Sequence, residues 1–167
     1  MTRVVVNDAS CLIDLRKGRL PPMLCRLPYR FVVPLPIRES EMPYLTAREW
    51  ESLDHGGMET HDLPPDQMKE VFALKRRHGR LSANDCFCLV TAQCHEDGIL
   101  LTGDGYLRSV AAALGVRVHG VLWIVDELAA AGACDDAFLI GALETWKTDR
   151  SVFLPDHLVD QRLRRLR

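Results

Sequence analysis

Hydrophobic and polar positions along the chain form blocks that predict short buried strands, each followed by a helix. The first block, Val4–Val6, is an uninterrupted β-branched run, typical of a strand buried on both faces of a parallel sheet. Apolar residues at helical spacing follow in Cys11–Leu15, and Gly18 closes this unit. The same alternation returns at Ile99–Thr102, an apolar run that leads through a glycine-rich turn into another helical pattern. This order predicts a parallel sheet with helices on its faces.

The remaining segments extend this pattern. Further strands are predicted at Phe31–Val33 and Val116–Val118, and Met58–Leu63 is predicted as an edge strand. Apolar spacing, capping residues and glycine breaks predict helices over Thr46–Leu53, Asp66–His78, Ser82–Cys94, Tyr106–Leu114, Val121–Ala131, Asp135–Trp146 and Pro155–Leu166. The expected fold class is therefore α/β, with three layers (α/β/α) around a central, mostly parallel sheet.

Composition narrows the class of protein without naming a function. The 167 residues correspond to about one domain, and a net charge of −2 excludes a general polycationic attraction to nucleic acid. The apolar run at the N-terminus is too short for a signal peptide or a membrane span, so we expect a cytoplasmic protein without a membrane partner. The six cysteines form no C-x-x-C pair and are expected to be buried small hydrophobes.

Three aspartates stand where a parallel sheet places its ligands. Asp8 follows the first strand, Asp104 follows the strand at Ile99–Thr102, and Asp85 begins the helix that leads into that strand. Ligands of open parallel sheets bind beyond the carboxyl ends of the strands. Carboxylates are hard oxygen ligands that suit Mg²⁺ or Mn²⁺. These three side chains are therefore candidates for a metal site.

Helix capping is the alternative explanation for each aspartate. Asp8 and Asp104 stand where a helix N-cap residue is expected, and Asp85 follows Ser82 at the spacing of a capping box. Spacing alone leaves both interpretations open.

Three stretches carry a resemblance to a known family, in the order VVVNDASCLIDL, LSANDCFCLVTA and ILLTGDGYLRSVA. They resemble the acidic motifs of PIN-domain nucleases, particularly the VapC-like toxins, and GVRVHGVLWIVDEL resembles the segment that follows the last acid. The resemblance covers most of Val4–Leu128. It implies a PIN-like nuclease domain over residues 1–131, with residues 132–167 as a C-terminal helical extension packed on the same domain. It also implies an Mg²⁺- or Mn²⁺-dependent endoribonuclease, the toxin of a type II toxin–antitoxin pair.

The resemblance also assigns roles to residues. Asp8, Asp85 and Asp104 match the first, third and fourth family acids, and Ser10 and Thr102 match the supporting hydroxyls. On this basis RNA phosphodiesters would be hydrolysed by metal-activated water, without a covalent intermediate.

The second family acid is ambiguous, because Glu39 and Glu41 both follow the second strand. Glu41 is favoured because a hydrophobic residue follows it, as in the family pattern, although Pro43 departs from that pattern. Asp8, Glu41 and Asp85 are then expected to hold the catalytic ion, with Asp104 completing the site.

Basic residues near these motifs are candidates for gripping the RNA backbone. They are Lys75, Arg76, Arg77 and Arg80, which run into the Asp85 motif, and Arg108, which follows Asp104 by about one helical turn. A solvated helix end that suits the helix dipole is the alternative for the first group. The expected partners are an RNA substrate, a cognate antitoxin and a second copy of the chain.

Two rival functions remain to be separated. A haloacid-dehalogenase-like phosphatase would carry a DxD motif at the end of the first strand, and Ser10 stands where its second aspartate would be. A solitary PIN-like module that binds RNA or protein with little or no catalysis is the other alternative. Metal-dependent RNA cleavage that EDTA abolishes would distinguish the enzyme from the module.

Overall fold

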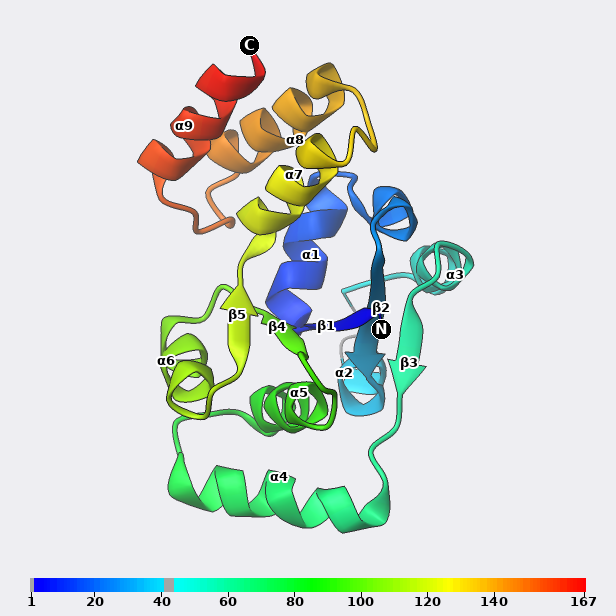
Figure 1. The fold of residues 1–167 in the computed structure, drawn as a ribbon, viewed down its shortest axis with the longest axis vertical. Coiled ribbons are helices and arrows are strands. Elements are labelled where there is room, and N and C mark those ends of the chain that lie inside the picture. Colours follow the sequence, from blue (N-terminus) through cyan, green and yellow to red (C-terminus); the bar gives the residue numbers. More distant parts are fainter. Residues whose placement is uncertain (1, 41–43) are drawn as a thin grey trace.

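A five-stranded sheet with all strands parallel forms the centre of the protein (Figure 1). The computed structural model describes residues 2–40 and 44–167. The sheet order is β3-β2-β1-β4-β5. Its strands are β1 (Arg3–Asn7), β2 (Tyr29–Pro34), β3 (Glu59–His61), β4 (Ile99–Leu101) and β5 (Arg117–His119). Helices cover both faces, so the predicted three-layer α/β/α class is confirmed.

The helices divide between the two faces of this sheet. On one side α1 contacts α7 and α8, and on the other α5 packs against the sheet with α4 outside it (Figure 1). The helices are α1 (Ala9–Lys17), the 3-10 helix η1 (Pro21–Arg26), α2 (Leu35–Ser40), α3 (Ala47–His55), α4 (Pro65–Arg77), α5 (Ala83–Gln93), α6 (Gly105–Ala113), α7 (Val121–Ala130), α8 (Asp136–Thr148) and α9 (Asp156–Leu166).

The strand order places a topological switch point between β1 and β4, and we call the region beyond the carboxyl ends of these two strands the crevice. From β1 the chain adds β2 and then β3 on one side, whereas β4 and β5 lie on the other side of β1. Val5 is therefore paired with Phe31 of β2 and also with Ile99 of β4. Connections that leave β1 and β4 diverge at this switch point, and ligands of open parallel sheets bind there.

The hydrophobic pattern follows from the position of each strand. Val5 and Val6 in the central strand are fully buried, as is Leu100 in β4, because helices cover both faces of the sheet. At the edge of the sheet, β3 has the polar sequence Glu59–His61, which agrees with the predicted edge strand.

The last two helices contribute buried side chains to the hydrophobic core. Trp146 of α8 is almost completely buried, and its indole N–H donates a hydrogen bond to the backbone oxygen of Asp14 in α1 at 2.7 Å. The chain passes close to this ring at Gly18, where an added Cβ would lie 3.0 Å from a ring carbon. Burial of Val159 and Leu163 ties α9 to the same core.

The cysteines are all free thiols, but they differ in burial. The prediction of buried small hydrophobes is right for Cys11, Cys86 and Cys88 and wrong for Cys25 and Cys94, which are exposed. Within residues 2–40 and 44–167, no helix is long and apolar enough to cross a membrane.

Candidate active site

Asp8 lies at the centre of the candidate site. It follows directly after β1 and is the N-cap of α1, where its Oδ1 accepts hydrogen bonds from the backbone N–H of Cys11 at 2.8 Å and from the Ser10 hydroxyl at 3.0 Å. Only 6% of Asp8 is exposed. Burial raises the pKa of Asp8 above its ordinary value, and the hydrogen bonds from Thr102, Cys11 and Ser10 oppose that rise.

Thr102 connects Asp8 to the second aspartate of the crevice. It follows β4, and its hydroxyl donates to Asp8 Oδ2 while accepting from the backbone N–H of Asp104 at 3.1 Å. The Asp8 N–H also donates to the backbone oxygen of Leu101 at 3.2 Å. The carboxyl ends of β1 and β4 are therefore joined by side-chain and backbone hydrogen bonds.

Asp104 lies at the mouth of this crevice. It is the N-cap of α6, and its Oδ1 accepts the backbone N–H of Leu107 at 2.7 Å. Its side chain is exposed, in contrast to buried Asp8. The pair thus consists of one desolvated and one solvated carboxylate, and Thr102 connects the first to the backbone of the second residue.

Asp85 approaches the same region from α5. It completes the predicted capping box, because it accepts the Ser82 N–H at 2.8 Å while the Ser82 hydroxyl accepts the Asp85 N–H at 3.0 Å. One turn further along α5 lies buried Cys88, whose Sγ is 3.8 Å from the backbone oxygen of Asn7. Burial raises the pKa of the Cys88 thiol well above its ordinary value, and the charges of Asp8 and Asp85 raise it further. Cys88 therefore lies within the field of both carboxylates.

All three aspartates cap helices, so the capping interpretation is confirmed for each of them. Capping does not occupy every carboxylate oxygen. Asp85 caps through Oδ2 and Asp104 through Oδ1, and no hydrogen bond from a described residue reaches the other oxygen of either. These two oxygens remain available to a ligand. Within the described part of the chain, no group of three His, Cys, Asp or Glu side chains is arranged to hold a metal ion.

Of the two glutamates proposed as the second acid, the structure describes one, which lies on α2. Glu39 is exposed in the last turn of α2, whereas Glu41 lies outside the described residues. The hydroxyl of Ser40 accepts a hydrogen bond from the side-chain amide of Asn84 at 2.8 Å. The end of α2 is thus beside the residue that precedes Asp85.

A hollow of about 350 Å³ opens beside Asp104. Its lining residues come from α1, from the turn after β4 and from the α8–α9 connection: Ser10, Ile13, Asp14, Lys17, Gly103, Asp104, Ser151 and Phe153. Burial raises the pKa of Asp14 to about 6, and the charges of Asp8 and Asp149 add to the rise while Lys17 opposes it. A larger hollow of about 650 Å³ is bordered by His95, Asp97 and Arg117 at the amino ends of β4 and β5, away from the aspartates.

The predicted basic residues differ in their contacts. The Lys75 ammonium donates to the backbone oxygens of Gly79 and Leu81 at 2.8 and 2.6 Å and so closes the α4–α5 turn. Arg80 lies over the ring of Tyr106, with its guanidinium carbon 4.3 Å from the ring centre.

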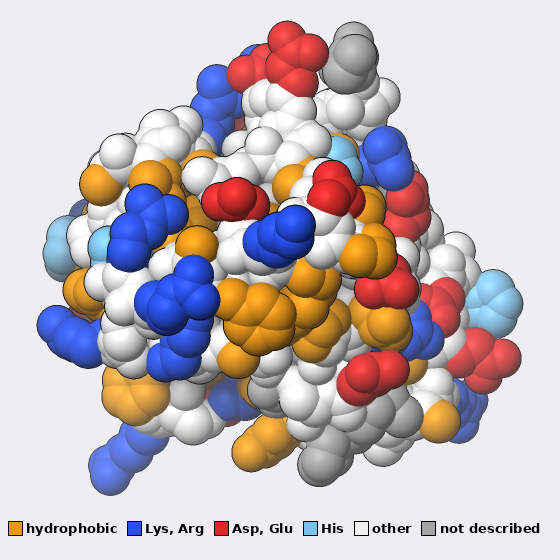
Figure 2. Space-filling view, turned by 90° about the horizontal axis from the view of Figure 1, so that it is seen from below, with side chains coloured by type: hydrophobic (Ala, Val, Ile, Leu, Met, Phe, Trp, Pro, Cys, Tyr) orange, Lys and Arg blue, Asp and Glu red, His pale blue; other side chains and the backbone are white. Residues whose placement is uncertain are grey.

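The other basic candidates also separate into two kinds. Arg108 donates to the backbone oxygen of Thr102 at 3.0 Å and so supports the turn before Asp104. Arg76 and Arg77 are exposed at the end of α4. Lys and Arg side chains gather toward one side of the face that α4 presents (Figure 2).

Sequence reasoning did not single out three residues that the structure places around the crevice. Asn7 is fully buried at the end of β1, where its amide nitrogen donates to the backbone oxygen of Val32 at 3.1 Å. Its Oδ1 is buried without a hydrogen-bond partner in the described structure. Asp14 and Phe153 line the hollow beside Asp104. A polar residue ending an apolar strand was a signal for Asn7, but no sequence pattern indicated the other two.

The fold and the acidic crevice define the class of protein: a parallel α/β domain with carboxylates at its topological switch point. The chain matches the model of DUF3368, a PIN-domain family, over residues 4–167. It therefore belongs to this PIN-domain family, and its general class is that of the PIN nucleases. A search of curated proteins found no match.

Proposed function

We propose that this PIN-domain protein is an endoribonuclease that hydrolyses RNA phosphodiester bonds with the help of Mg²⁺ or Mn²⁺. The observation that carries the proposal is the hydrogen-bonded link from Asp8 through Thr102 to Asp104 at the switch point of the sheet. This link holds the Asp8 carboxylate and the backbone of Asp104 at the position where parallel sheets bind ligands.

Carboxylate oxygens are the ligands that a hard divalent cation prefers. Asp8, Asp85 and Asp104 provide carboxylate oxygens, and Glu41 would be the fourth ligand by family resemblance, with Glu39 as its alternative. Such an ion would polarise a phosphodiester and lower the pKa of a bound water. The hydroxyls of Ser10 and Thr102 orient Asp8 for this role, and their hydrogen bonds favour its ionised form.

The start of α6 and the end of α4 provide contacts for RNA phosphates. The exposed guanidinium groups of Arg76 and Arg77 would attract the backbone, and Arg80 is positioned by its contact with Tyr106. Lys75 and Arg108 are also candidates, although both already donate hydrogen bonds to backbone oxygens. These basic groups would position the strand without reading its sequence.

A toxin role and its partners form a finer part of the proposal. By its resemblance to VapC-like proteins, we infer that the nuclease is held inactive by a cognate antitoxin and acts as a homodimer in the cytoplasm. A small upstream gene whose co-expression restores growth would support the first inference. Light scattering of the purified protein would measure the second.

The deciding experiment compares two aspartate-to-asparagine variants. Wild-type protein is expected to cleave a mixed RNA pool with Mg²⁺ or Mn²⁺ and to stop when EDTA is added. Asp85→Asn should lower the rate at least about 100-fold, since several kcal/mol of charge stabilisation are lost. The asparagine oxygen can still accept the Ser82 N–H, so the helix cap is retained.

Asp97→Asn is the matched control. Asp97 is exposed just before the amino end of β4, away from the acidic crevice. Its φ is 56°, a conformation that asparagine also tolerates. This variant loses the same charge and should cleave like the wild type. Undiminished cleavage by Asp85→Asn would overturn the proposal, and RNA binding without cleavage by the wild type would favour the binding module.

A further inference from the structure

Phe153 is an aromatic side chain presented to solvent beside the acidic crevice. It lies in the connection between α8 and α9, and 89% of it is exposed, which is more than for the other exposed large hydrophobic residues, Tyr44, Phe72 and Leu114. Burying such a side chain lowers the free energy by about 1.5–3 kcal/mol, and folding of this chain does not bury it. Phe153 is therefore available to a ligand.

The position of Phe153 connects it to the candidate active site. It borders the same hollow as Asp104 and Ser10, and the Ser10 hydroxyl is hydrogen-bonded to Asp8. One wall of this hollow is thus aromatic, while the acidic crevice forms another. A strand bound across the acids would pass this ring.

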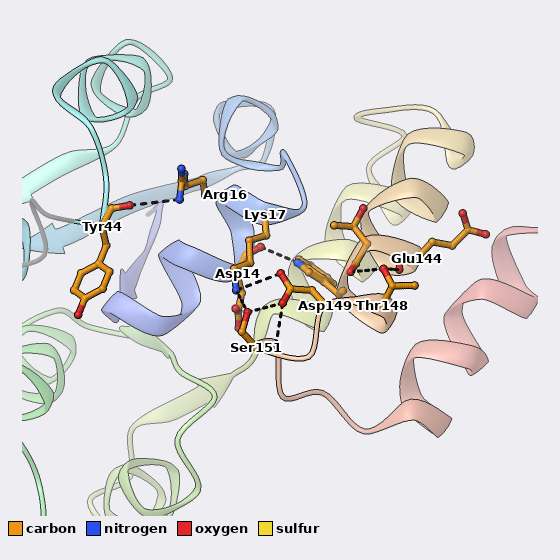
Figure 3. A network of polar contacts seen from close by, with 10 residues as sticks. Asp14, Arg16, Lys17, Tyr44, Glu144, Thr148, Asp149 and Ser151 are labelled. Atoms are coloured by element: carbon orange, nitrogen blue, oxygen red, sulfur yellow. Dashed lines mark hydrogen bonds and ion pairs between the residues drawn. The ribbon is translucent and has the colours of Figure 1, made fainter.

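The connection that carries Phe153 is tied to α1 by polar contacts (Figure 3). The Lys17 ammonium donates to the Ser151 hydroxyl at 2.5 Å and lies 3.4 Å from an oxygen of Asp149. The Ser151 N–H donates to the Asp149 carboxylate at 2.9 Å, and Val152 is buried. These contacts hold the residues on the N-terminal side of Phe153, so the ring is presented from a fixed segment.

We propose that Phe153 is a stacking platform for one base of a single-stranded RNA bound at the acidic crevice. Every base has a face that can stack on an aromatic ring, so this contact would add affinity with little sequence preference. The inference rests on the proposed function for the identity of the substrate. It adds a specific recognition residue on a segment outside the acidic motifs.

The surroundings favour a base over a protein partner. A stable protein interface has an apolar core of substantial area, whereas the hollow beside Phe153 is lined mostly by polar side chains and only Ile13 adds a second large apolar one. A single base needs one aromatic face, which Phe153 offers. The Lys17 ammonium on the same hollow carries the positive charge that attracts a phosphate.

Binding of short fluorescent RNA strands, measured by anisotropy in EDTA, where no cleavage is expected, tests the platform. Phe153→Ala is expected to weaken binding about tenfold, the effect of losing one stacked base. Phe153→Trp should bind at least as well as the wild type. Phe153→Leu keeps an apolar side chain but has no π face, so it should behave like Phe153→Ala.

Two controls distinguish base stacking from nonspecific hydrophobic binding. Phe72→Ala removes another exposed phenylalanine, 59% exposed on α4, and should leave the affinity within about twofold of wild type. The second control is a series of RNA strands that each lack one base, at a different position in each strand. At the position that faces Phe153, loss of the base should weaken wild-type binding about tenfold and Phe153→Ala binding very little.

The outcomes distinguish this inference from the proposed function. Full binding by Phe153→Ala or Phe153→Leu, or an equal loss from Phe72→Ala, would overturn the stacking platform even if the protein cleaves RNA. Loss of binding confined to Phe153→Ala and Phe153→Leu would support it, even in a protein that shows no cleavage. Cleavage is scored separately, through Asp85→Asn.

Discussion

The Thr102 hydroxyl donates a hydrogen bond to the carboxylate of Asp8, which lies 94 positions earlier in the sequence. The same hydroxyl oxygen accepts the N–H of Asp104. One buried side chain therefore sets the position of a desolvated acid and the backbone of a solvated one. This arrangement makes the threonine testable independently of the carboxylates.

Replacing Thr102 by valine should impair the site while preserving the shape of the side chain. We expect Thr102→Val to lower RNA cleavage about tenfold or more and to reduce the free energy of unfolding by about 1–3 kcal/mol, because buried polar groups lose their partner. The hydrogen bond from Thr102 lowers the pKa of Asp8, so its loss should raise that pKa and shift the acid limb of the pH–rate profile to higher pH.

Thr102→Ser is the control, since it retains the hydroxyl. This variant should recover most of the activity and the original acid limb. Equal activity of the valine and serine variants would show that the hydroxyl has no role at the site.

Asp14 should make the stability of the protein pH-dependent. Its pKa of about 6 in the folded protein exceeds its ordinary value of 3.8, so the folded state binds the proton more tightly than the unfolded state. Stability is therefore lost as the pH rises from about 4 to about 6, and the ionised carboxylate is destabilising above that range. Asp14→Asn should increase the free energy of unfolding by about 1–2 kcal/mol at pH 8, allowing for partial solvent screening.

Urea unfolding of both proteins at pH 8 and pH 4.5 provides the measurement. The advantage of Asp14→Asn should be smaller at pH 4.5 than at pH 8, because the wild-type carboxyl is then largely protonated in the folded state. A constant difference at both pH values would contradict the assignment of the shift to Asp14.

The exposed arginines at the end of α4 should contribute to RNA affinity and little to stability. For the double variant Arg76→Gln/Arg77→Gln, we expect weaker RNA binding and a shallower dependence of the binding constant on salt, because fewer counterions are released. The free energy of unfolding should change by no more than about 0.5 kcal/mol.

Arg48→Gln, at an exposed position on α3, is the comparison for loss of positive charge. Anisotropy titrations over a series of salt concentrations give both slopes. If Arg48→Gln changes the slope as much per charge as the double variant, the end of α4 has no special role.

Two glycine substitutions test how α8 is joined to α1. In Gly18→Ala the new Cβ would meet the buried Trp146 ring at 3.0 Å, and we expect a loss of about 1–3 kcal/mol from overpacking. In Gly141→Ala, within α8, the new Cβ meets nothing within 4 Å, and the higher helix propensity of alanine should add about 0.5–1 kcal/mol.

Both variants are followed by thermal unfolding with far-ultraviolet and tryptophan signals. A single transition in each, shifted in opposite directions, is expected if α8 unfolds together with the sheet. A separate transition for Gly18→Ala would show that the C-terminal helices unfold on their own.

Local pattern was enough to predict the five strands and most of the helices, but not the 3-10 helix η1, whose two prolines suggested only a break. Val4–Val6 and Ile99–Thr102 are apolar because their strands are covered on both faces, and the edge strand at β3 is short and polar for the opposite reason. Pattern did not predict the order of the strands, which depends on contacts between distant segments. The position of β1 between β2 and β4 is one such case.

The candidate site was predicted in part. The positions of Asp8 and Asp104 after strands indicated a shared edge, and the structure joins them through Thr102, which the family resemblance had named. Whether Glu39 or Glu41 is the second acid remains a prediction, because Glu41 lies outside the described residues. Phe153 gave no signal, because it stands between Val152 and Leu154 and a short apolar run does not show which of its side chains is exposed.

The switch point between β1 and β4 has a consequence for when the protein can act. Asp8 belongs to the first strand, whereas Thr102 and Asp104 follow the fourth, so these groups are far apart in an unfolded or half-synthesised chain. They meet only when β4 has paired with β1, which is a contact between segments far apart in the sequence. The acidic site is therefore absent from an unfinished or unfolded chain, and any chemistry that depends on it begins only after β1 and β4 have paired.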